Sequence, residues 1–209
     1  VGLTVPATAA HAAIANLEEV LVTARRKEES LQDVPVSMTV FSQETLDERN
    51  VISATDLVKY TPSLSANTRF GSDQESFAIR GFTQEFRTTA SVCVYFADVV
   101  APRGGAVITA GDGAGPGAFF DLQNVQVLKG PQGTLFGRNA TVGAINMRSM
   151  SPQDELDGSV SLEGGSYGMQ RYTAMLNAPV GDRLAFRAAG LYESTDGYTE
   201  NTVTGQEPG

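Results

Sequence analysis

One pentapeptide of this chain has the spacing of a catalytic motif. Gly164-Gly165-Ser166-Tyr167-Gly168 fits the G-x-S-x-G pattern of a hydrolase nucleophile. That serine needs a strand before it, a helix after it and a histidine base within reach. Here a strand-like pattern follows, and the only histidine is His11. We therefore interpret the pentapeptide as a tight turn between strands, and we expect no enzymatic activity.

The chain also lacks the residue patterns that a metal or cofactor site would need. Gly133–Arg138 is weakly similar to a phosphate loop, but no Gly-Lys-Ser/Thr occurs in the chain. Asp154, Glu155 and Asp157 lack the spacing of an EF-hand and are better explained as a solvated acidic linker. The single cysteine, Cys93, lies in an apolar run and is predicted to be buried. We expect no metal site and no cofactor.

Charge and hydropathy argue against two further classes of protein, those that bind nucleic acid and those with membrane-spanning helices. With 15 basic and 24 acidic residues the net charge is −9, which disfavours binding to nucleic acid. No run approaches the 18 apolar residues of a membrane-spanning helix, although a membrane-spanning β-strand would escape that test.

The first residues are typical of an exported protein. The chain begins without Met, and small residues lead to Ala10-His11-Ala12, an A-x-A cleavage pattern. We expect residues 1–15 to be the remnant of a signal peptide, with a frayed alanine-rich helix as the alternative. The run Glu18–Ala24 favours β-structure but has no neighbouring segment with which to pair.

Two short helices are predicted to follow a strand at Pro35–Phe41, in which Val36, Met38 and Val40 share one face. Ser42 can cap the first helix, with Leu46 facing inward. Ser53 and Asp56 form a capping-box pattern for the second, which Thr61-Pro62 ends. Short strands are then predicted at Phe77–Arg80, Val92–Phe96, Val125–Leu128 and Ala144–Met147, joined by glycine-rich connections such as Gly104–Gly117.

From Leu156 onward apolar and polar residues alternate. The apolar series are Val160 and Leu162; Tyr172, Ala174 and Leu176; and Leu184, Phe186, Ala188 and Tyr192. Strands with one apolar and one polar face suit a transmembrane β-barrel, but also a half-buried meander of a soluble sandwich. The alternation alone leaves both open.

The run FDLQNVQVLKGPQGTLFGRNATVGAIN at 120–146 strongly resembles the plug-domain signature of TonB-dependent outer-membrane receptors. Phe77–Phe82 matches the upstream I-R-G-F element, and Leu17–Ala24 resembles a TonB box. The resemblance implies an α+β plug domain, with a small mixed sheet and short helices, followed by the first antiparallel strands of a transmembrane β-barrel. Its expected parts are a TonB box and linker at 16–29, the plug at 30–152 and barrel strands at 153–209.

The resemblance also implies roles for individual residues. The periplasmic domain of TonB would add as a strand to the box, and an extended segment with free backbone groups suits that pairing. The expected TonB-binding residues are Glu18, Glu19, Val20, Leu21, Val22, Thr23 and Ala24. The plug residues expected to contact the barrel are Arg80, Lys129 and Arg138, because a barrel lumen is polar. Arg69, Phe70, Gln84 and Phe86 are candidate contacts for the solute.

The implied function is TonB-dependent uptake, across the outer membrane, of a scarce large solute such as an iron–siderophore, a corrinoid or an oligosaccharide. The family's barrel has roughly 22 strands, of which only about three can be identified here, so we expect a fragment or a truncated product. The alternative is a stand-alone, plug-like module for periplasmic interaction or signalling. Gln123-Asn124 and Gln126 stand where the family usually carries charges.

Overall fold

The computed structural model describes residues 21–22, 27, 29–30, 32–67, 76–83, 90–101, 119–181 and 183–196. The chain forms two units, residues 1–35 and 36–209. In the first, β1 (Leu21–Val22) pairs antiparallel with β2 (Glu29–Ser30), with Leu21 opposite Ser30. The prediction that the segment around Leu21 has nothing to pair with is therefore wrong. Its partner, β2, follows the basic residues Arg25, Arg26 and Lys27 in the sequence, and no sequence pattern indicates the pairing.

The two predicted helices are confirmed together with their caps. Helix α1 (Gln43–Glu48) begins after Ser42, whose hydroxyl accepts a hydrogen bond from the backbone N–H of Thr45. Helix α2 (Ala54–Tyr60) begins after Ser53, and both halves of the capping box with Asp56 are present. These bonds satisfy backbone N–H groups that the first turn of a helix leaves unpaired.

A mixed five-stranded sheet has the order β3-β8-β9-β6-β7. Strands β6 and β9 are parallel and the other neighbours are antiparallel. The strands are β3 (Met38–Ser42), β6 (Val92–Phe96), β7 (Val99–Val100), β8 (Leu122–Lys129) and β9 (Gly143–Ser149). Four predicted strands, which correspond to β3, β8, β9 and β6, are thus neighbours in this sheet. The predicted strand β5 (Ser76–Ile79) instead pairs with β4 (Leu64–Asn67), which was not predicted.

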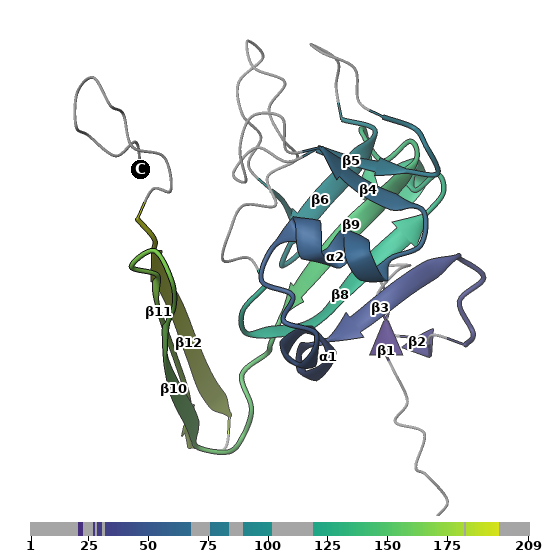
Figure 1. The fold of residues 1–209 in the computed structure, drawn as a ribbon. Coiled ribbons are helices and arrows are strands. Elements are labelled where there is room, and N and C mark those ends of the chain that lie inside the picture. The colour runs from purple at the N-terminus through teal and green to yellow at the C-terminus, as the bar shows by residue number, and fades with distance from the viewer. Residues whose placement is uncertain are drawn as a thin grey trace, which may run out of the picture. The chain divides into compact units, whose positions relative to one another are not determined.

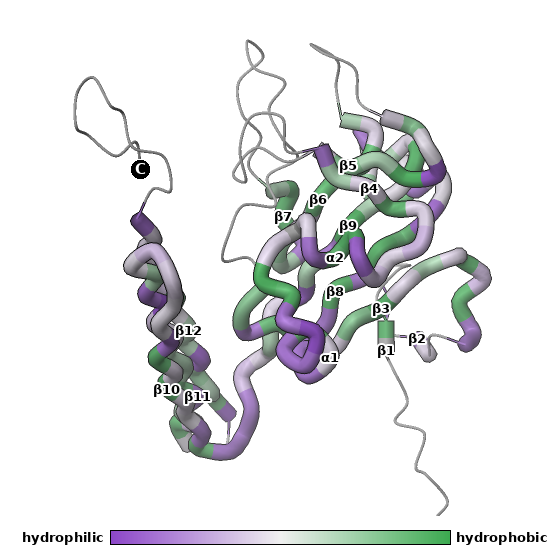
Figure 2. The backbone as a smooth tube through the Cα atoms, viewed as in Figure 1, coloured by the Kyte–Doolittle hydropathy of each residue, from purple (hydrophilic) through white to green (hydrophobic). Residues whose placement is uncertain are grey.

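The core lies between this sheet and the elements over one of its faces. Figure 1 shows α2 and the β4–β5 pair over the sheet, and Figure 2 shows hydrophobic stretches along β6 and β9. Leu46, Leu57 and Phe77 pack there against the apolar side chains of the sheet. On β3 the core residue is Phe41, while Met38 and Val40 are only partly buried. Cys93 is buried, as predicted.

Two of the glycines in the signature segment have positive φ, and a third is required by close packing. Gly130 and Gly137 have φ of 126° and 74°. A Cβ on Gly143 would lie 2.5 Å from Ile79 Cδ1 and 2.5 Å from the Leu128 carbonyl oxygen. Gly133 has neither constraint: it begins helix α3 (Gly133–Phe136) and faces open space.

A separate three-stranded sheet ends the described chain. It has the order β10-β11-β12 and is antiparallel throughout, with β10 at Asp157–Gly164, β11 at Gln170–Val180 and β12 at Leu184–Ser194. The G-x-S-x-G pentapeptide is a turn between β10 and β11, where Gly165 N–H donates to the Met169 carbonyl and Gly168 has a positive φ. None of the helices in the described ranges is long and apolar enough to cross a membrane.

Candidate functional site

The three-stranded sheet has one apolar and one polar face. A soluble protein would bury the apolar face, whereas here the apolar face is exposed. One face carries apolar side chains that are exposed, with 72% of Leu162 and 63% of Phe186 accessible. The remaining large members of that face are Val160, Tyr172, Leu176, Val180, Leu184 and Tyr192, all of them exposed. A contiguous apolar surface of this kind normally marks a contact with lipid or with another protein.

The opposite face carries polar residues, and those on the central strand β11 are buried. Arg171 is 8% exposed, Thr173 is 9% exposed and Asn177 is fully buried. These residues alternate along β11 with the apolar ones, as a strand with two different faces requires. We call this polar face of β10–β12 the wall, and residues 36–152 the central domain.

Asn177 fastens the connection between the central domain and the wall. Its side-chain amide donates to the carbonyl oxygens of Gln153 and Glu155, at 2.8 and 2.5 Å, and its Oδ1 accepts from Gln153 N–H at 2.9 Å. A fully buried amide is costly unless it is hydrogen-bonded, and this one is bonded through both of its ends. The path of the chain from β9 into β10 is therefore set by one side chain on β11.

An ion pair joins the central domain to the wall directly. The Arg187 guanidinium on β12 donates to both carboxylate oxygens of Asp121, with Nη2–Oδ1 at 2.6 Å, Nε–Oδ1 at 3.1 Å and Nε–Oδ2 at 3.0 Å. The two side chains are only 9% and 14% exposed. Forked contacts of this type are the strong form of the arginine–carboxylate bond, since both the charge and the geometry match.

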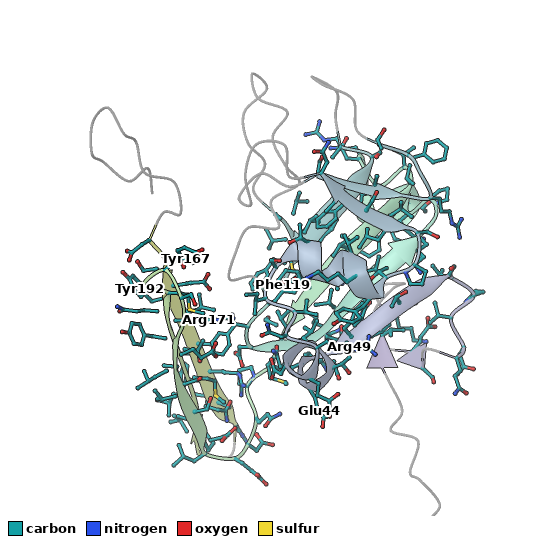
Figure 3. The ribbon with its side chains drawn as sticks, viewed as in Figure 1. Glu44, Arg49, Phe119, Tyr167, Arg171 and Tyr192 are labelled. Carbon is teal, nitrogen blue, oxygen red and sulfur yellow. The ribbon has the colours of Figure 1, made fainter. Side chains whose placement is uncertain are left out.

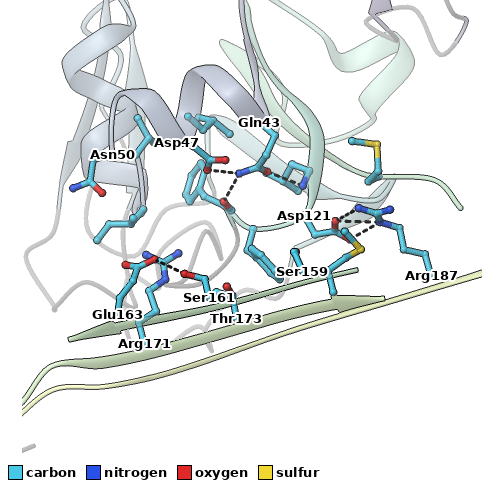
Figure 4. Close-up of a pocket in the computed structure, with 18 residues that line it drawn as sticks. Gln43, Asp47, Asn50, Asp121, Ser159, Ser161, Glu163, Arg171, Thr173 and Arg187 are labelled. Carbon is cyan, nitrogen blue, oxygen red and sulfur yellow. Dashed lines mark hydrogen bonds and ion pairs between the residues drawn. The ribbon is translucent and has the colours of Figure 1, made fainter. Parts of the chain in front are cut away.

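Beside this pair lies a cavity of about 410 Å³ (Figure 4). From the central domain it is lined by Gln43, Asp47 and Asn50 of α1 and the turn that follows, and by the segment Phe119–Leu122. The wall contributes Ser159, Ser161, Glu163, Arg171, Thr173, Met175 and Arg187. Apolar side chains, among them Leu46, Val51 and Ile52, also line it, so the cavity presents a mixed polar and apolar surface.

Arg171 is the least satisfied polar group of the cavity. Its Nε is buried without a hydrogen-bond partner, and the nearest carboxylate oxygen, Glu193 Oε2, is 3.9 Å away. At that distance the carboxylate offers charge attraction but no hydrogen bond. The wall therefore presents an arginine that still has donor capacity toward the cavity.

Aromatic residues gather at the end of the sheet near Arg171. The rings of Tyr172 and Tyr192 stack with centroids 6.1 Å apart, and both are exposed on the apolar face. Figure 3 shows Tyr167, in the turn between β10 and β11, at the same end. Tyrosines at the rim of an apolar strand surface are typical of the boundary between lipid and water.

The three basic residues predicted to contact the barrel lie in the central domain, away from Asp121. Arg80 is exposed and follows β5 with a φ of 54°, and Arg138 is exposed in the turn after α3. Burial, followed by the charge of Arg80, lowers the pKa of Lys129. Within the described residues none of the three forms an ion pair, so their pairing with a barrel stays a prediction.

The other predicted site residues lie mostly outside the described ranges. This holds for the solute candidates Arg69, Phe70, Gln84 and Phe86, and for Glu18, Glu19, Val20, Thr23 and Ala24 of the TonB-binding segment. Leu21 and Val22 are described and form β1. The signal-peptide residues 1–15 are also outside.

Sequence reasoning missed Asp121, Arg187 and Asn177 as a group. Arg187 and Asn177 occupy polar positions between the apolar residues of the alternating strands, and that alternation is the signal that could have placed them on the inner face. Asp121 carried no comparable signal, because its partner lies 66 positions along the chain. Only the fold shows that an acid of the central domain and a base of the wall meet.

Comparisons with known proteins agree with this architecture. Residues 30–144, more than half of the chain, match the family model described as the TonB-dependent receptor plug domain. The chain is 28% identical to the vitamin B12 transporter BtuB of Vibrio vulnificus, over 87% of this chain and 28% of the transporter.

Two solved structures share the fold. The ferric yersiniabactin uptake receptor FyuA of Yersinia pestis has a TM-score of 0.69 at 25% identity, covering 83% of this chain and 27% of the receptor. The outer-membrane ferripyoverdine receptor of Pseudomonas aeruginosa, bound to ferripyoverdine, has a TM-score of 0.70 at 21% identity, covering 87% and 23%. The chain thus spans less than a third of each relative's length, and the expected fold, a plug domain with a mixed sheet followed by antiparallel strands, is confirmed. The chain belongs to the TonB-dependent receptor plug domain family.

Proposed function

We propose that this chain is the plug and the first barrel strands of an outer-membrane receptor that imports a scarce, large solute with energy delivered by TonB. The observation that carries the proposal is the reversed polarity of β10–β12. On the central strand β11 the polar residues Arg171, Thr173 and Asn177 are buried, whereas the apolar residues of the opposite face of the sheet are exposed. That arrangement is what a barrel wall needs when lipid lies outside and a hydrated plug lies inside.

Strand length supports the same conclusion. Strands β11 and β12 have 11 residues each, close to the roughly 9–11 that a tilted strand needs to cross a bilayer. A soluble sandwich, the other interpretation of the alternating sequence, would turn the apolar face inward. A stand-alone module in the periplasm would leave this apolar surface in water, which disfavours the alternative as well. The chain's partners on this proposal are TonB, the outer membrane and the solute.

The relatives and the candidate contact residues indicate the chemical class of the solute only broadly. The named relatives handle vitamin B12 or an iron-loaded siderophore. We extend that range to corrinoids, iron–siderophores and oligosaccharides, with contacts proposed at Arg69, Phe70, Gln84 and Phe86. Guanidinium, aromatic and amide side chains together suit a polar solute with both charge and rings. No catalytic step is part of this function.

TonB is proposed to bind the segment Glu18–Ala24 by adding a strand to it. Part of that segment, β1, already pairs with β2. TonB would pair with β1 along its second edge or in place of β2, and the backbone groups of the segment would carry the contact.

Replacing Leu21 with proline tests this proposal, because proline removes the N–H and with it a ladder hydrogen bond. In the complete receptor, we expect Leu21→Pro to abolish energised uptake while binding of solute to de-energised cells is unchanged. Leu21→Ala is the matched control, since it trims the side chain but keeps the N–H, and it should retain most of the uptake. The measurement uses radiolabelled cobalamin and a panel of ferric siderophores. Wild-type uptake by the Leu21→Pro variant would contradict the assignment of the TonB segment.

A further inference from the structure

We propose that the apolar face of β10–β12 carries a binding site for one phospholipid, with the phosphate held at Arg183 and an acyl chain lying in a hollow of that face. This site rests on the proposed function, which places the apolar face in the membrane. It adds to that function a specific lipid ligand with a defined position on the sheet.

The hollow is an open cavity of about 660 Å³ on the three-stranded sheet. The residues of the apolar face that line it are Gly158, Val160, Ala174, Leu176, Ala188 and Gly190. They lie in two neighbouring rows across the strands. In one row Ala174 is opposite Val160 and Gly190, and in the other Leu176 is opposite Gly158 and Ala188. Most of these residues are glycine or alanine, so the middle of the face is lower than its surroundings.

Large side chains stand at both ends of the hollow. Toward the turn between β10 and β11, the next row holds Leu162 and the stacked pair Tyr172 and Tyr192. Toward the turn between β11 and β12 lie Leu184 and Phe186, which are 61% and 63% exposed. A hollow of this kind is filled by its medium, because apolar atoms without neighbours on one side lose dispersion contacts. In a membrane that medium is an acyl chain.

A guanidinium lies at the end of the strands, where the headgroup of such a lipid would be. Arg183 is in the turn between β11 and β12, directly before Leu184, and it is exposed. It forms no ion pair with any residue that the structure describes. Its charge is therefore available to a phosphate, as with other basic residues that bind lipid headgroups at a membrane surface.

The separation between Arg183 and the hollow suits the length of a lipid. The seven residues of extended chain from Arg183 to Gly190 span roughly 24 Å, or roughly 17 Å of depth at a tilt of about 45°. One hydrocarbon leaflet is roughly 15 Å thick. A lipid with its phosphate at Arg183 therefore passes Leu184 and Phe186 and reaches the hollow with the end of its chain.

The turn that contains Arg183 indicates which leaflet supplies the lipid. It comprises residues 181–183 and is shorter than the other turn of the sheet, residues 165–169. Transmembrane barrels carry their short turns on the periplasmic side. We therefore assign the headgroup to the periplasmic leaflet, and we choose phosphatidylglycerol as the probe because its headgroup is anionic.

Native mass spectrometry of the complete receptor, titrated with phosphatidylglycerol in mild detergent, tests the headgroup contact. We expect Arg183→Gln to weaken the apparent affinity about fivefold, which is the effect of one arginine near a lipid surface. Arg183→Lys is the control, because it keeps the charge and should bind like the wild type. Diacylglycerol has the chains without the phosphate and should bind several-fold more weakly to the wild type.

Filling the hollow tests the position of the acyl chain. A Cβ at Gly190 would meet no atom within 4 Å, so Gly190→Leu adds a side chain there without a clash. We expect this variant to weaken phosphatidylglycerol binding at least about fivefold, because the chain loses its dispersion contacts with the sheet. Leu162→Phe is the matched control. It adds volume to the same face outside the hollow and should leave binding unchanged.

Each outcome decides whether the site exists. Weaker binding by both Arg183→Gln and Gly190→Leu, with both controls like the wild type, supports it. Equal binding by all variants overturns it, since the retained lipid then covers the barrel without a preferred position. Receptor dimers that Gly190→Leu dissociates also overturn it, because a second copy of the chain would then occupy the hollow.

The lipid site and the proposed function fail in different ways. A receptor that resides in the outer membrane and takes up solute, but whose variants all bind lipid equally, contradicts the lipid site alone. A wild-type receptor that does not insert into lipid vesicles contradicts the proposed function, and the lipid site fails with it.

Discussion

The central domain and the three-stranded sheet obey opposite rules within one chain. In the central domain Phe41, Phe77 and Ile145 are almost completely buried. In the sheet Leu162 and Phe186 are mostly exposed, while Asn177 has no accessible surface. Both regions contain strands with alternating side chains, so the alternation does not decide which face turns inward.

The difference lies in the medium that each region is built to face. Burial of apolar surface away from water stabilises a domain by about 25 cal/mol per Å², which explains the core of the central domain. A strand in contact with lipid gains nothing by turning its apolar face inward, and its polar face is free to meet a hydrated plug. The comparison therefore separates a folding core from a surface that we propose to face lipid.

The largest expected effect comes from placing a charge on the apolar face of the three-stranded sheet. Leu162→Arg should destabilise the inserted state of the complete receptor by about 2–4 kcal/mol, since a cation would face hydrocarbon. Ser161→Arg, one position along β10 and facing the cavity, should cost much less. The measurement is the free energy of unfolding from lipid vesicles. It is obtained by urea titration, with the heat-dependent mobility shift of barrels as the readout of the folded fraction.

The control makes this result interpretable. Both variants add the same side chain to the same strand, so any general effect of arginine on β-propensity cancels. Equal costs at positions 161 and 162, or a larger cost at 161, would contradict the assignment of the apolar face to lipid.

A second, smaller effect tests how tightly the central domain is packed. Gly143→Ala should destabilise the central domain by roughly 1–3 kcal/mol, because the new methyl group would clash with the Leu128 carbonyl and with Ile79. Gly133→Ala is the matched control. It lies in open space at the start of α3, and alanine there should be neutral or stabilise by up to about 1 kcal/mol.

The distinction between the two glycines is readily measured. Chemical denaturation of the receptor in detergent, followed by fluorescence of a probe on the central domain, reports its unfolding separately from that of the barrel. A Gly143→Ala variant as stable as the wild type would show that β8 and β9 can move apart, contrary to the packing described.

Local features of this fold were predictable because they depend on neighbouring residues. The caps at Ser42 and Ser53, the strand at Val92–Phe96 and the turn at Gly164–Gly168 each follow from a few adjacent side chains. The family signature then supplied the domain type, because its glycine spacing is specific.

Long-range pairings were not predictable in the same way. Three contacts illustrate this: the β1–β2 pairing, the Asp121–Arg187 bond and the hydrogen bonds of Asn177. In each, the sequence around one residue does not identify its partner. Asn124 and Gln126 illustrate the same limit: they replace residues that are usually charged, and the structure buries both and bonds the Gln126 amide to Asn124 Oδ1 at 2.8 Å. The sequence of a strand does not show whether a polar side chain will hydrogen-bond to water or to another side chain.

The smallest expected effect is the pH dependence of the stability that the cap of α2 gives to the central domain. Partial burial of Asp56 acts to raise its pKa, but hydrogen bonds from Lys59, Ser53 and Ile52 outweigh it, so the pKa is lowered from 3.8. A depressed carboxyl pKa stabilises the folded state above the unfolded value, and that contribution is lost as the pH falls through the folded pKa. Asp56→Asn should therefore cost at most about 1 kcal/mol near neutral pH, because the ion pair with Lys59 is solvent-exposed. The difference from the wild type should shrink progressively below about pH 4. Urea titrations of both proteins from pH 7 to pH 3 provide the measurement, and a difference that stays constant across that range would show that the capping carboxylate does not titrate with folding.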